Sequence, residues 1–248
     1  MNTLQVRRSS AEAEVAPDPS WRDLYRAGGV SAILFVVPIL VAIVLIVIAP
    51  PPLNADGATT LQYVASHKVL YLIEQILWLA PSVFALVVFL ALFQALKHLN
   101  KSYAALGALA GIISWALGLA IPTTGGGAPV LVYLSDQYMT AATAAQHTAF
   151  ATAAEVFIAE NNITSAAGIL APVGILIISF VMLKGVFPKG VAYLGIVTGV
   201  LGIVSEALRP ILGPGYFVYG LLLPTWFLVV GWKLYRLARD YETVHKNN

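Results

Sequence analysis

The fold is decided by residues 69–122, which read VLYLIEQILWLAPSVFALVVFLALFQALKHLNKSYAALGALAGIISWALGLAIP. Two long apolar runs are joined by a short polar turn that contains His98, Asn100 and Lys101. A helix crosses ~30 Å of hydrocarbon in roughly 20 apolar residues, and each run is about that long or longer. The stretch therefore predicts two antiparallel membrane-spanning helices, with one acid, Glu74, inside the first.

Composition extends this prediction to the whole chain. Of its 248 residues, 59% are hydrophobic and 10% are charged, and the mean hydropathy is +0.82. Backbone groups in lipid must bond within their own segment, and the apolar runs are continuous rather than alternating, so the predicted fold is an all-α integral membrane protein. The net charge of +2 and the scattered basic residues argue against a nucleic-acid partner. The absence of cysteine excludes disulfides and Cys-ligated zinc.

Six transmembrane helices are predicted within a membrane domain at residues 27–238. Their approximate limits are 27–48, 69–96, 103–121, 164–183, 191–212 and 216–237. A polar connection at 53–68 has room for one or two helical turns, and residues 128–160 are expected to form an external helical segment. Residues 1–26 and 239–248 are predicted to be cytosolic tails.

The distribution of basic residues decides between six spans and seven. The Ala- and Thr-rich stretch 141–159 is a candidate seventh span. With six spans, all Lys and Arg residues except Lys68 and Arg209 fall on one side, whereas a seventh span divides the 14 basic residues equally. Because Lys and Arg concentrate in cytosolic loops, we expect six spans with both termini cytosolic.

Two hairpins of the chain resemble each other. Residues 101–127 align without gaps with residues 189–215, and the identical pairs are Lys101/Lys189, Ala104/Ala192, Leu106/Leu194, Gly107/Gly195, Gly111/Gly199, Pro122/Pro210, Gly125/Gly213 and Gly127/Gly215. The pattern predicts that the helix 2–3 hairpin is repeated in parallel as helices 4–5, about a twofold axis along the membrane normal. Stripes of small residues allow close packing, so helices 3 and 5 are expected to be central and are able to touch each other.

Charged residues mark the positions at which the two hairpins differ. Glu206 stands opposite Gly118 in the alignment, and Glu74 stands opposite Ser165. A charged side chain deep in a span costs at least ~2.5 kcal/mol and normally faces the bundle interior with a partner. We therefore expect an outward-facing polar cavity in which both glutamates take part.

The candidate ligand-binding residues gather around these two acids. They are Glu74, Glu206, Tyr71, Trp78, Gln75 and Arg209. Acids outnumber bases on the predicted outer side, which favours a small cationic or amphiphilic ligand. Two structural alternatives stay open, because Glu206 and Arg209 are able to neutralise each other and Glu74 is able to hydrogen-bond to a neighbouring helix.

No familiar catalytic or cofactor motif is present. The chain lacks HExxH, GxSxG and Walker sequences. A divalent metal would have only His67, His147 and Glu155 as ligands, and such residues are more typical of a membrane interface. The sequence therefore assigns no catalytic residue and no cofactor.

Two segments resemble a known family. These are LFQALKHLNKSYAALG at 92–107 and MLKGVFPKGVAYLGIVTGVLGI at 182–203, where a span ends in a Gly-x-x-Pro-like turn before the Leu-Gly start of the next. The chain is similar to bacterial six-helix membrane proteins known only as a domain of unknown function. The resemblance implies a location in a bacterial cytoplasmic (inner) membrane and carries over no functional residue.

Three functions remain open from the sequence. The first is binding or transport of the cationic ligand, and the second is an accessory or assembly subunit of a membrane complex. The third is a metal-dependent enzyme at the outer leaflet, although a non-enzymatic role is favoured. The partners expected are the lipid bilayer, a small-molecule ligand, and copies of the chain or a larger membrane complex.

Overall fold

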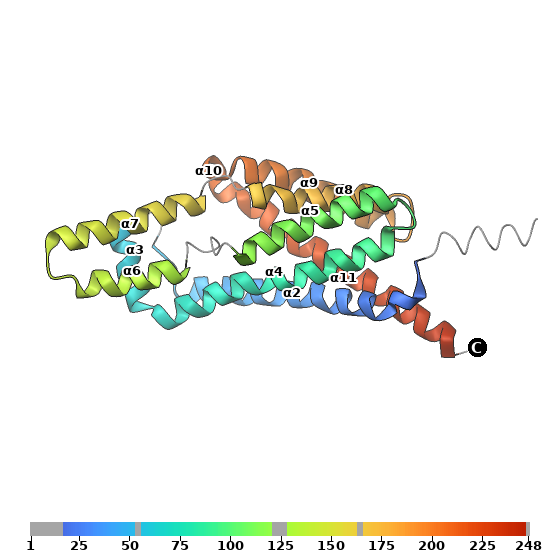
Figure 1. Cartoon of the computed structure of the whole chain (residues 1–248), viewed down its shortest axis with the longest axis horizontal. Helices are drawn as coiled ribbons and strands as arrows, with labels where there is room; N and C mark the ends of the chain where they lie inside the picture. The colour runs from blue at the N-terminus through green and yellow to red at the C-terminus, as the bar shows by residue number, and fades with distance from the viewer. Residues whose placement is uncertain (1–16, 53–55, 121–127, 163–165, 247–248) are drawn as a thin grey trace, which may run out of the picture.

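The structure is a computed structural model that describes residues 17–52, 56–120, 128–162 and 166–246. All regular elements in these ranges are helical, which confirms the all-α prediction. Six long helices form the main bundle: α2 (Arg22–Ile48), α4 (Lys68–Leu96), α5 (Lys101–Ala120), α8 (Ala166–Met182), α9 (Lys189–Ala207) and α11 (Tyr216–Lys246). Each contacts the next in that order, and α11 closes the ring against α2 (Figure 1).

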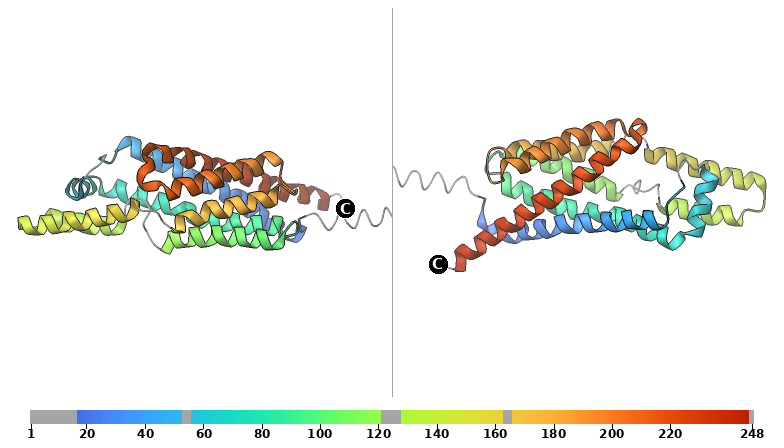
Figure 2. Two further views of the ribbon diagram at one scale, coloured as in Figure 1. Left: turned by 90° about the horizontal axis from the view of Figure 1, so that it is seen from above. Right: turned by 180° about the vertical axis from the view of Figure 1, so that it is seen from behind.

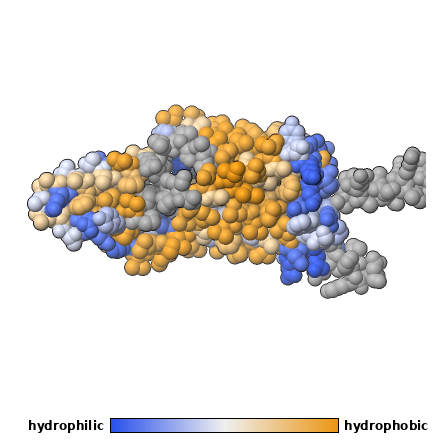
Figure 3. Space-filling model, in the orientation of Figure 1, coloured by the Kyte–Doolittle hydropathy of each residue, from blue (hydrophilic) through white to orange (hydrophobic). Residues whose placement is uncertain are grey.

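Aromatic side chains fill the middle of this ring. Phe35 of α2 stacks on Phe227 of α11 with ring centroids 3.8 Å apart, and Trp115 of α5 meets the edge of both rings. Phe35 and Phe227 are fully buried. On the face seen in Figure 3, an apolar belt covers the bundle, and a polar band borders this belt at one end.

Five of the bundle helices are long and apolar enough to cross a membrane. The exception is α8, whose 17 residues span only about 26 Å at 1.5 Å per residue. The chain is therefore a membrane-embedded helical protein, while a complete set of six spans stays a proposal. Nonetheless α8 packs between α5 and α9 and belongs to the same bundle.

Three helix limits differ by five residues or more from those expected from the sequence. Helix α2 begins at Arg22, inside the predicted N-terminal tail, and a 3₁₀ turn at Pro19–Trp21 precedes it. Helix α9 ends at Ala207, and α10 (Arg209–Leu212) and a 3₁₀ turn at Gly213–Gly215 follow it. Pro210 has no N–H with which to continue the α9 ladder, but proline is tolerated in the first turn of a new helix. Helix α11 continues to Lys246, so the predicted C-terminal tail is helical in most of its length. Residues 1–16 of the predicted N-terminal tail lie outside the described residues.

Gly107 of α5 and Gly199 of α9 both face α8. A Cβ added to Gly174 of α8 would lie 2.6 Å from the carbonyl oxygen of Gly107 and 2.7 Å from the amide nitrogen of Gly111. On the other side, a Cβ on Gly199 would lie 2.7 Å from Cβ of Leu176. Helices α5 and α9 are thus separated by α8, and the contact between them that the sequence allows is not a main one.

The ring order also bears on the predicted repeat. The pairs α4–α5 and α8–α9 are adjacent, as a repeated hairpin requires. A twofold axis that places α5 beside α8 would also place α9 beside α4, whereas the principal neighbours of α9 are α8 and α11. The duplication remains a prediction.

Three further helices form a group beyond one end of the bundle (Figures 1 and 2). We call this group the cap: α3 (Gly57–Ser66), α6 (Ala128–Thr140) and α7 (Ala144–Asn162). It shares a separate apolar core with the start of α4, made by Leu61, Val64, Tyr71, Leu131, Leu134 and Ala154. The connection expected to hold one or two turns thus contains a ten-residue helix, α3. Helix α7 packs on α3 and α6 and is not among the spanning helices.

Four bundle helices carry an internal proline. These are Pro38 in α2, Pro81 in α4, Pro172 in α8 and Pro224 in α11. Each removes one backbone hydrogen bond from its helix, yet every helix continues through the proline.

Candidate functional site

Glu74 lies where the bundle meets the cap. Helix α4 starts beside the cap and ends at the polar band, where Nζ of Lys97 is 5.4 Å from the ring centroid of Trp21. The 23 residues from Lys97 back to Glu74 correspond to about 35 Å of helix. This exceeds the ~30 Å of hydrocarbon, so Glu74 stands at the cap-side boundary of the apolar belt.

The partners of Glu74 are aromatic. Nε1 of Trp78, one turn further along α4, donates a hydrogen bond of 3.2 Å to Oε1 of Glu74. Burial, followed by the nearby Glu74 carboxylate, raises the pKa of Tyr63, which places Tyr63 of α3 close to the acid. The Tyr63 hydroxyl donates to the carbonyl of Ala49 at 2.7 Å and so ties the cap to the end of α2. Tyr71 lies one turn before Glu74 and is buried.

Glu74 is half-buried and has no basic partner among the described residues, where the ion pairs involve other acids. Its neighbour Gln75 is 4% exposed, and Oε1 of Gln75 accepts no hydrogen bond from the described part of the chain. An acid in this setting favours a cation, because its charge is partly desolvated and not compensated.

Glu206 is enclosed at the opposite side of the ring. It is 5% exposed, and the Tyr216 hydroxyl donates a 2.6 Å hydrogen bond to its Oε1. Nη1 of Arg209 lies 3.5 Å from Oε2, and the guanidinium stands 5.2 Å from the Tyr216 ring centroid. Gly168 of α8 covers the same carboxylate, since a Cβ there would be 2.7 Å from Oε2. Glu206 and Arg209 therefore form an internal ion pair.

The structure thus arranges the candidate ligand residues as two groups. Glu74 contacts Trp78 of its own helix, whereas Glu206 contacts α8, α10 and α11. No contact joins the two acids in the ranges that the structure describes. The reason is the ring order, which inserts α5 and α8 between α4 and α9.

The metal candidates also have separate neighbours. The His67 ring stacks on Tyr63 with centroids 4.7 Å apart, and the His147 ring meets Tyr138 edge-on. Oε1 of Glu155 accepts a 3.3 Å hydrogen bond from the Gly57 amide. Within the described ranges no three His, Asp or Glu side chains form a group suited to a metal ion.

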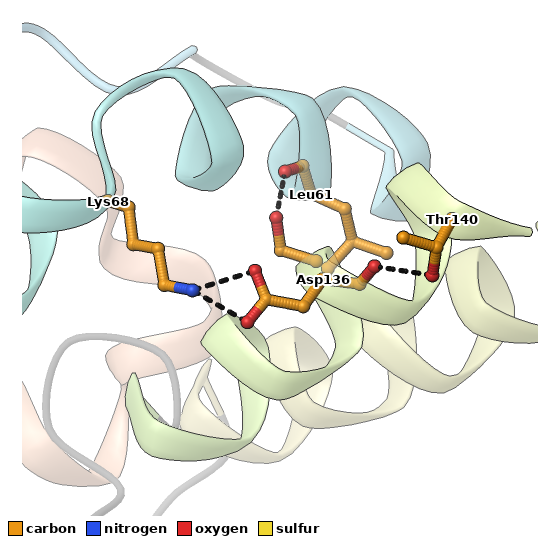
Figure 4. A network of polar contacts seen from close by, with 5 residues as sticks. Leu61, Lys68, Asp136 and Thr140 are labelled. Atoms are coloured by element: carbon orange, nitrogen blue, oxygen red, sulfur yellow. Dashed lines mark hydrogen bonds and ion pairs between the residues drawn. The ribbon is translucent and has the colours of Figure 1, made fainter.

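Sequence reasoning missed the polar contacts that fasten the cap to α4 (Figure 4). Nζ of Lys68 donates to both carboxylate oxygens of Asp136 on α6, at 2.8 and 2.6 Å. The neighbouring Ser135 donates to the carbonyl of Leu61 on α3 at 2.7 Å. Tyr63 was missed for the same reason, because contacts between separate helices leave no local spacing signal in the sequence.

The fold and the apolar belt define a membrane-embedded helical protein with a three-helix cap beyond one end of its bundle. Over residues 30–239 the chain matches the family described as Domain of unknown function (DUF4386), and it belongs to that family. This confirms the resemblance drawn from residues 92–107 and 182–203. No curated protein and no solved structure matches the chain.

Proposed function

We propose that the protein binds a small organic cation or a cationic amphiphile where the cap meets the bundle, as a receptor or transport protein of the membrane. Glu74 is the counter-ion, and Trp78 and Tyr63 supply aromatic surface beside it. The observation that carries the proposal is the half-buried Glu74 carboxylate, which has aromatic neighbours and no basic partner in the described ranges.

The chemistry of the pairing follows from these neighbours. A carboxylate at an apolar boundary attracts a cation more strongly than one in water, because the local dielectric constant is lower. Aromatic faces attract ammonium groups as well, by about 0.5–2 kcal/mol each. An apolar tail on the ligand would lie against the belt below Glu74, where Ile73 and Ile76 are exposed.

The membrane setting forms part of the proposal. We place six spans in a bacterial inner membrane, with the polar band at the cytosol and the cap outside. Support comes from the basic residues that lie beyond the bundle end opposite the cap, among them Lys97, Lys184 and Lys233.

Neither alternative function gains a specific observation. The small residues of α5 and α9 pack on α4, α8 and α11 inside the bundle, so they do not support a scaffold that recruits a partner through those faces. The enzyme alternative relied on His67, Glu74, His147 and Glu155, which have separate neighbours.

The test is equilibrium binding of tetraphenylphosphonium, a lipophilic cation, to the purified protein in neutral detergent, measured by calorimetry. Glu74→Gln removes the charge with little change in shape and is expected to weaken binding about 10- to 100-fold, the size of a charge-assisted contact. Asp23→Asn is the matched control, because it removes one negative charge from an exposed side chain at the opposite end of the bundle and should change affinity less than about 3-fold. Equal affinities for wild type and Glu74→Gln would reject the proposal.

A further inference from the structure

A basic cleft lies between α2 and α11 at the end of the bundle opposite the cap. Its lining residues are Arg22, Arg26, Tyr235, Ala238 and Arg239, and its volume is about 100 Å³. Arg22 and Arg26 are one turn apart on α2, and Tyr235 and Arg239 are one turn apart on α11. One face of each helix therefore presents guanidinium groups to the same space.

The close crossing of the two helices builds this cleft. A Cβ on Gly29 of α2 would lie 2.8 Å from Cβ of Tyr235 and 2.9 Å from the carbonyl oxygen of Gly231. Gly231 in turn approaches the backbone of Gly29 closely. The helices touch at this level and then separate towards their basic ends (Figure 2, right), which leaves the cleft between them.

The positive charge of the cleft is only partly compensated. Arg22 pairs with Asp23 at 3.3 Å, but the Asp23 side chain is 87% exposed, so this pair is weak. Arg26 and Arg239 make no ion pair with a described residue. Guanidinium groups held together in this way favour an anion, and their planar forks match two oxygens of a phosphate.

Apolar surface continues from the arginines along both helices. On α2, Val30, Ile33 and Val37 follow Arg26 on the same face and are exposed. On α11, Trp232 and Leu228 precede Arg239 on the same face and are also exposed. An anion with hydrocarbon chains would satisfy both parts of this surface at once, which a free phosphate would not.

We infer that this cleft binds the phosphate headgroup of an anionic phospholipid from the leaflet at the basic end of the bundle. Arg26 and Arg239 hold the phosphate, and the acyl chains lie along the exposed stripes of α2 and α11. Trp21 and Trp232 also lie towards this end of the bundle, and each faces a cation (5.4 Å to Lys97 and 5.9 Å to Arg236), as is common near lipid headgroups. The site is separate from Glu74 and does not depend on the ligand proposed there.

The test compares lipid binding by native mass spectrometry of the purified protein. Wild type should bind phosphatidylglycerol at least about 10-fold more tightly than phosphatidylcholine. Arg26→Gln/Arg239→Gln should lose about 10- to 30-fold of the phosphatidylglycerol affinity, since each basic group near a lipid surface contributes several-fold. The matched control, Lys101→Gln/Lys184→Gln, removes two charges from the same end outside the cleft and should lose less than about 3-fold.

Three further comparisons test the site, the identity of its ligand and the role of the guanidinium groups. Equal losses in the cleft and control variants would mean non-specific attraction to a basic surface and would overturn the site. Competition by inorganic phosphate or glycerol phosphate at the lipid's own concentration would overturn the assignment to a lipid. If the glutamine variant does not fold, Arg26→Lys/Arg239→Lys keeps the charge and loses the forked geometry. That variant should still lose several-fold affinity, and an unchanged affinity would refute the role of the forks.

Discussion

Gly174→Ala is the sharpest probe of the bundle, because its new methyl group would meet backbone rather than a movable side chain. The Cβ would lie 2.6 Å from the carbonyl oxygen of Gly107 and 2.7 Å from the amide nitrogen of Gly111. A carbon–oxygen contact is ordinarily about 3.3 Å or longer, so α5 and α8 must move apart locally by about 0.7 Å. We expect the bundle to lose stability.

The magnitude follows from two opposed effects. Alanine improves the helix propensity of the position by about 1 kcal/mol, whereas overpacking a tight contact costs about 1–3 kcal/mol. Gly220→Ala shows the propensity effect alone, because Gly220 lies inside α11 and a Cβ added there would have nothing within 4 Å. Both variants gain the same propensity, so Gly174→Ala should be less stable than Gly220→Ala by about 1–3 kcal/mol.

Thermal unfolding in mild detergent measures this difference. For a chain of this length, 1 kcal/mol corresponds to about 2–4 °C, so the Tm of Gly174→Ala should be about 2–12 °C below that of Gly220→Ala. Equal Tm values for the two variants would show that α5 and α8 do not approach closely at Gly174, and the packing described for α8 would be wrong.

The remaining predictions concern polar contacts. Arg209→Ala should destabilise the bundle by about 1–3 kcal/mol in chemical unfolding, because it leaves the buried Glu206 carboxylate without its cation. The double variant Arg209→Ala/Glu206→Gln should regain part of this stability, and no regain would argue against the ion pair. Ser135→Ala removes a buried hydrogen bond and should lower the stability of the cap by about 1 kcal/mol. Asp136→Asn breaks an exposed ion pair and should lower the stability of the cap by less. The rate of limited proteolysis within the cap measures both effects. Hydrogen bonds from the first turn of α3 lower the pKa of Asp56 in the folded protein. The stability that this cap contributes is therefore complete above the unfolded pKa and is lost as the pH falls through the lower folded pKa. Amide exchange in α3 should accelerate only below about pH 4, and acceleration already near pH 6 would contradict this.

The sequence predicts the helices better than their neighbours. Apolar length and prolines locate most bundle helices within a few residues, because each helix must satisfy its own backbone in lipid. The end of α9 at Ala207 was harder to predict, since the apolar pattern runs on past Pro210. Helix α3 was underestimated because its packing on α6 and α7 adds stability that a short polar sequence does not reveal.

The candidate site was predictable residue by residue but not as an arrangement. A charge in an apolar run identifies Glu74 and Glu206 as unusual, because burying a charge is unfavourable. Whether two such residues lie close together depends on the order of the helices around the ring. Small residues such as Gly107 and Gly199 indicate close packing, but they do not identify the helix that packs against them. Here both glycines pack on α8, which keeps the two acids apart.

Helices α2 and α4 each contain a proline at a similar depth, where the missing hydrogen bond makes the helix easier to bend. Pro38 lies 16 residues from Arg22, and Pro81 lies 16 residues from Lys97, so the two missing hydrogen bonds stand at a similar depth, about 24 Å from the basic end. On the cap side of the prolines, α3 connects the two helices. Its Tyr63 hydroxyl donates to the Ala49 carbonyl at the end of α2, and α3 leads into α4 at His67. The cap-side halves of α2 and α4 can therefore tilt together with the cap as one unit, while the halves at the basic end keep their packing in the bundle.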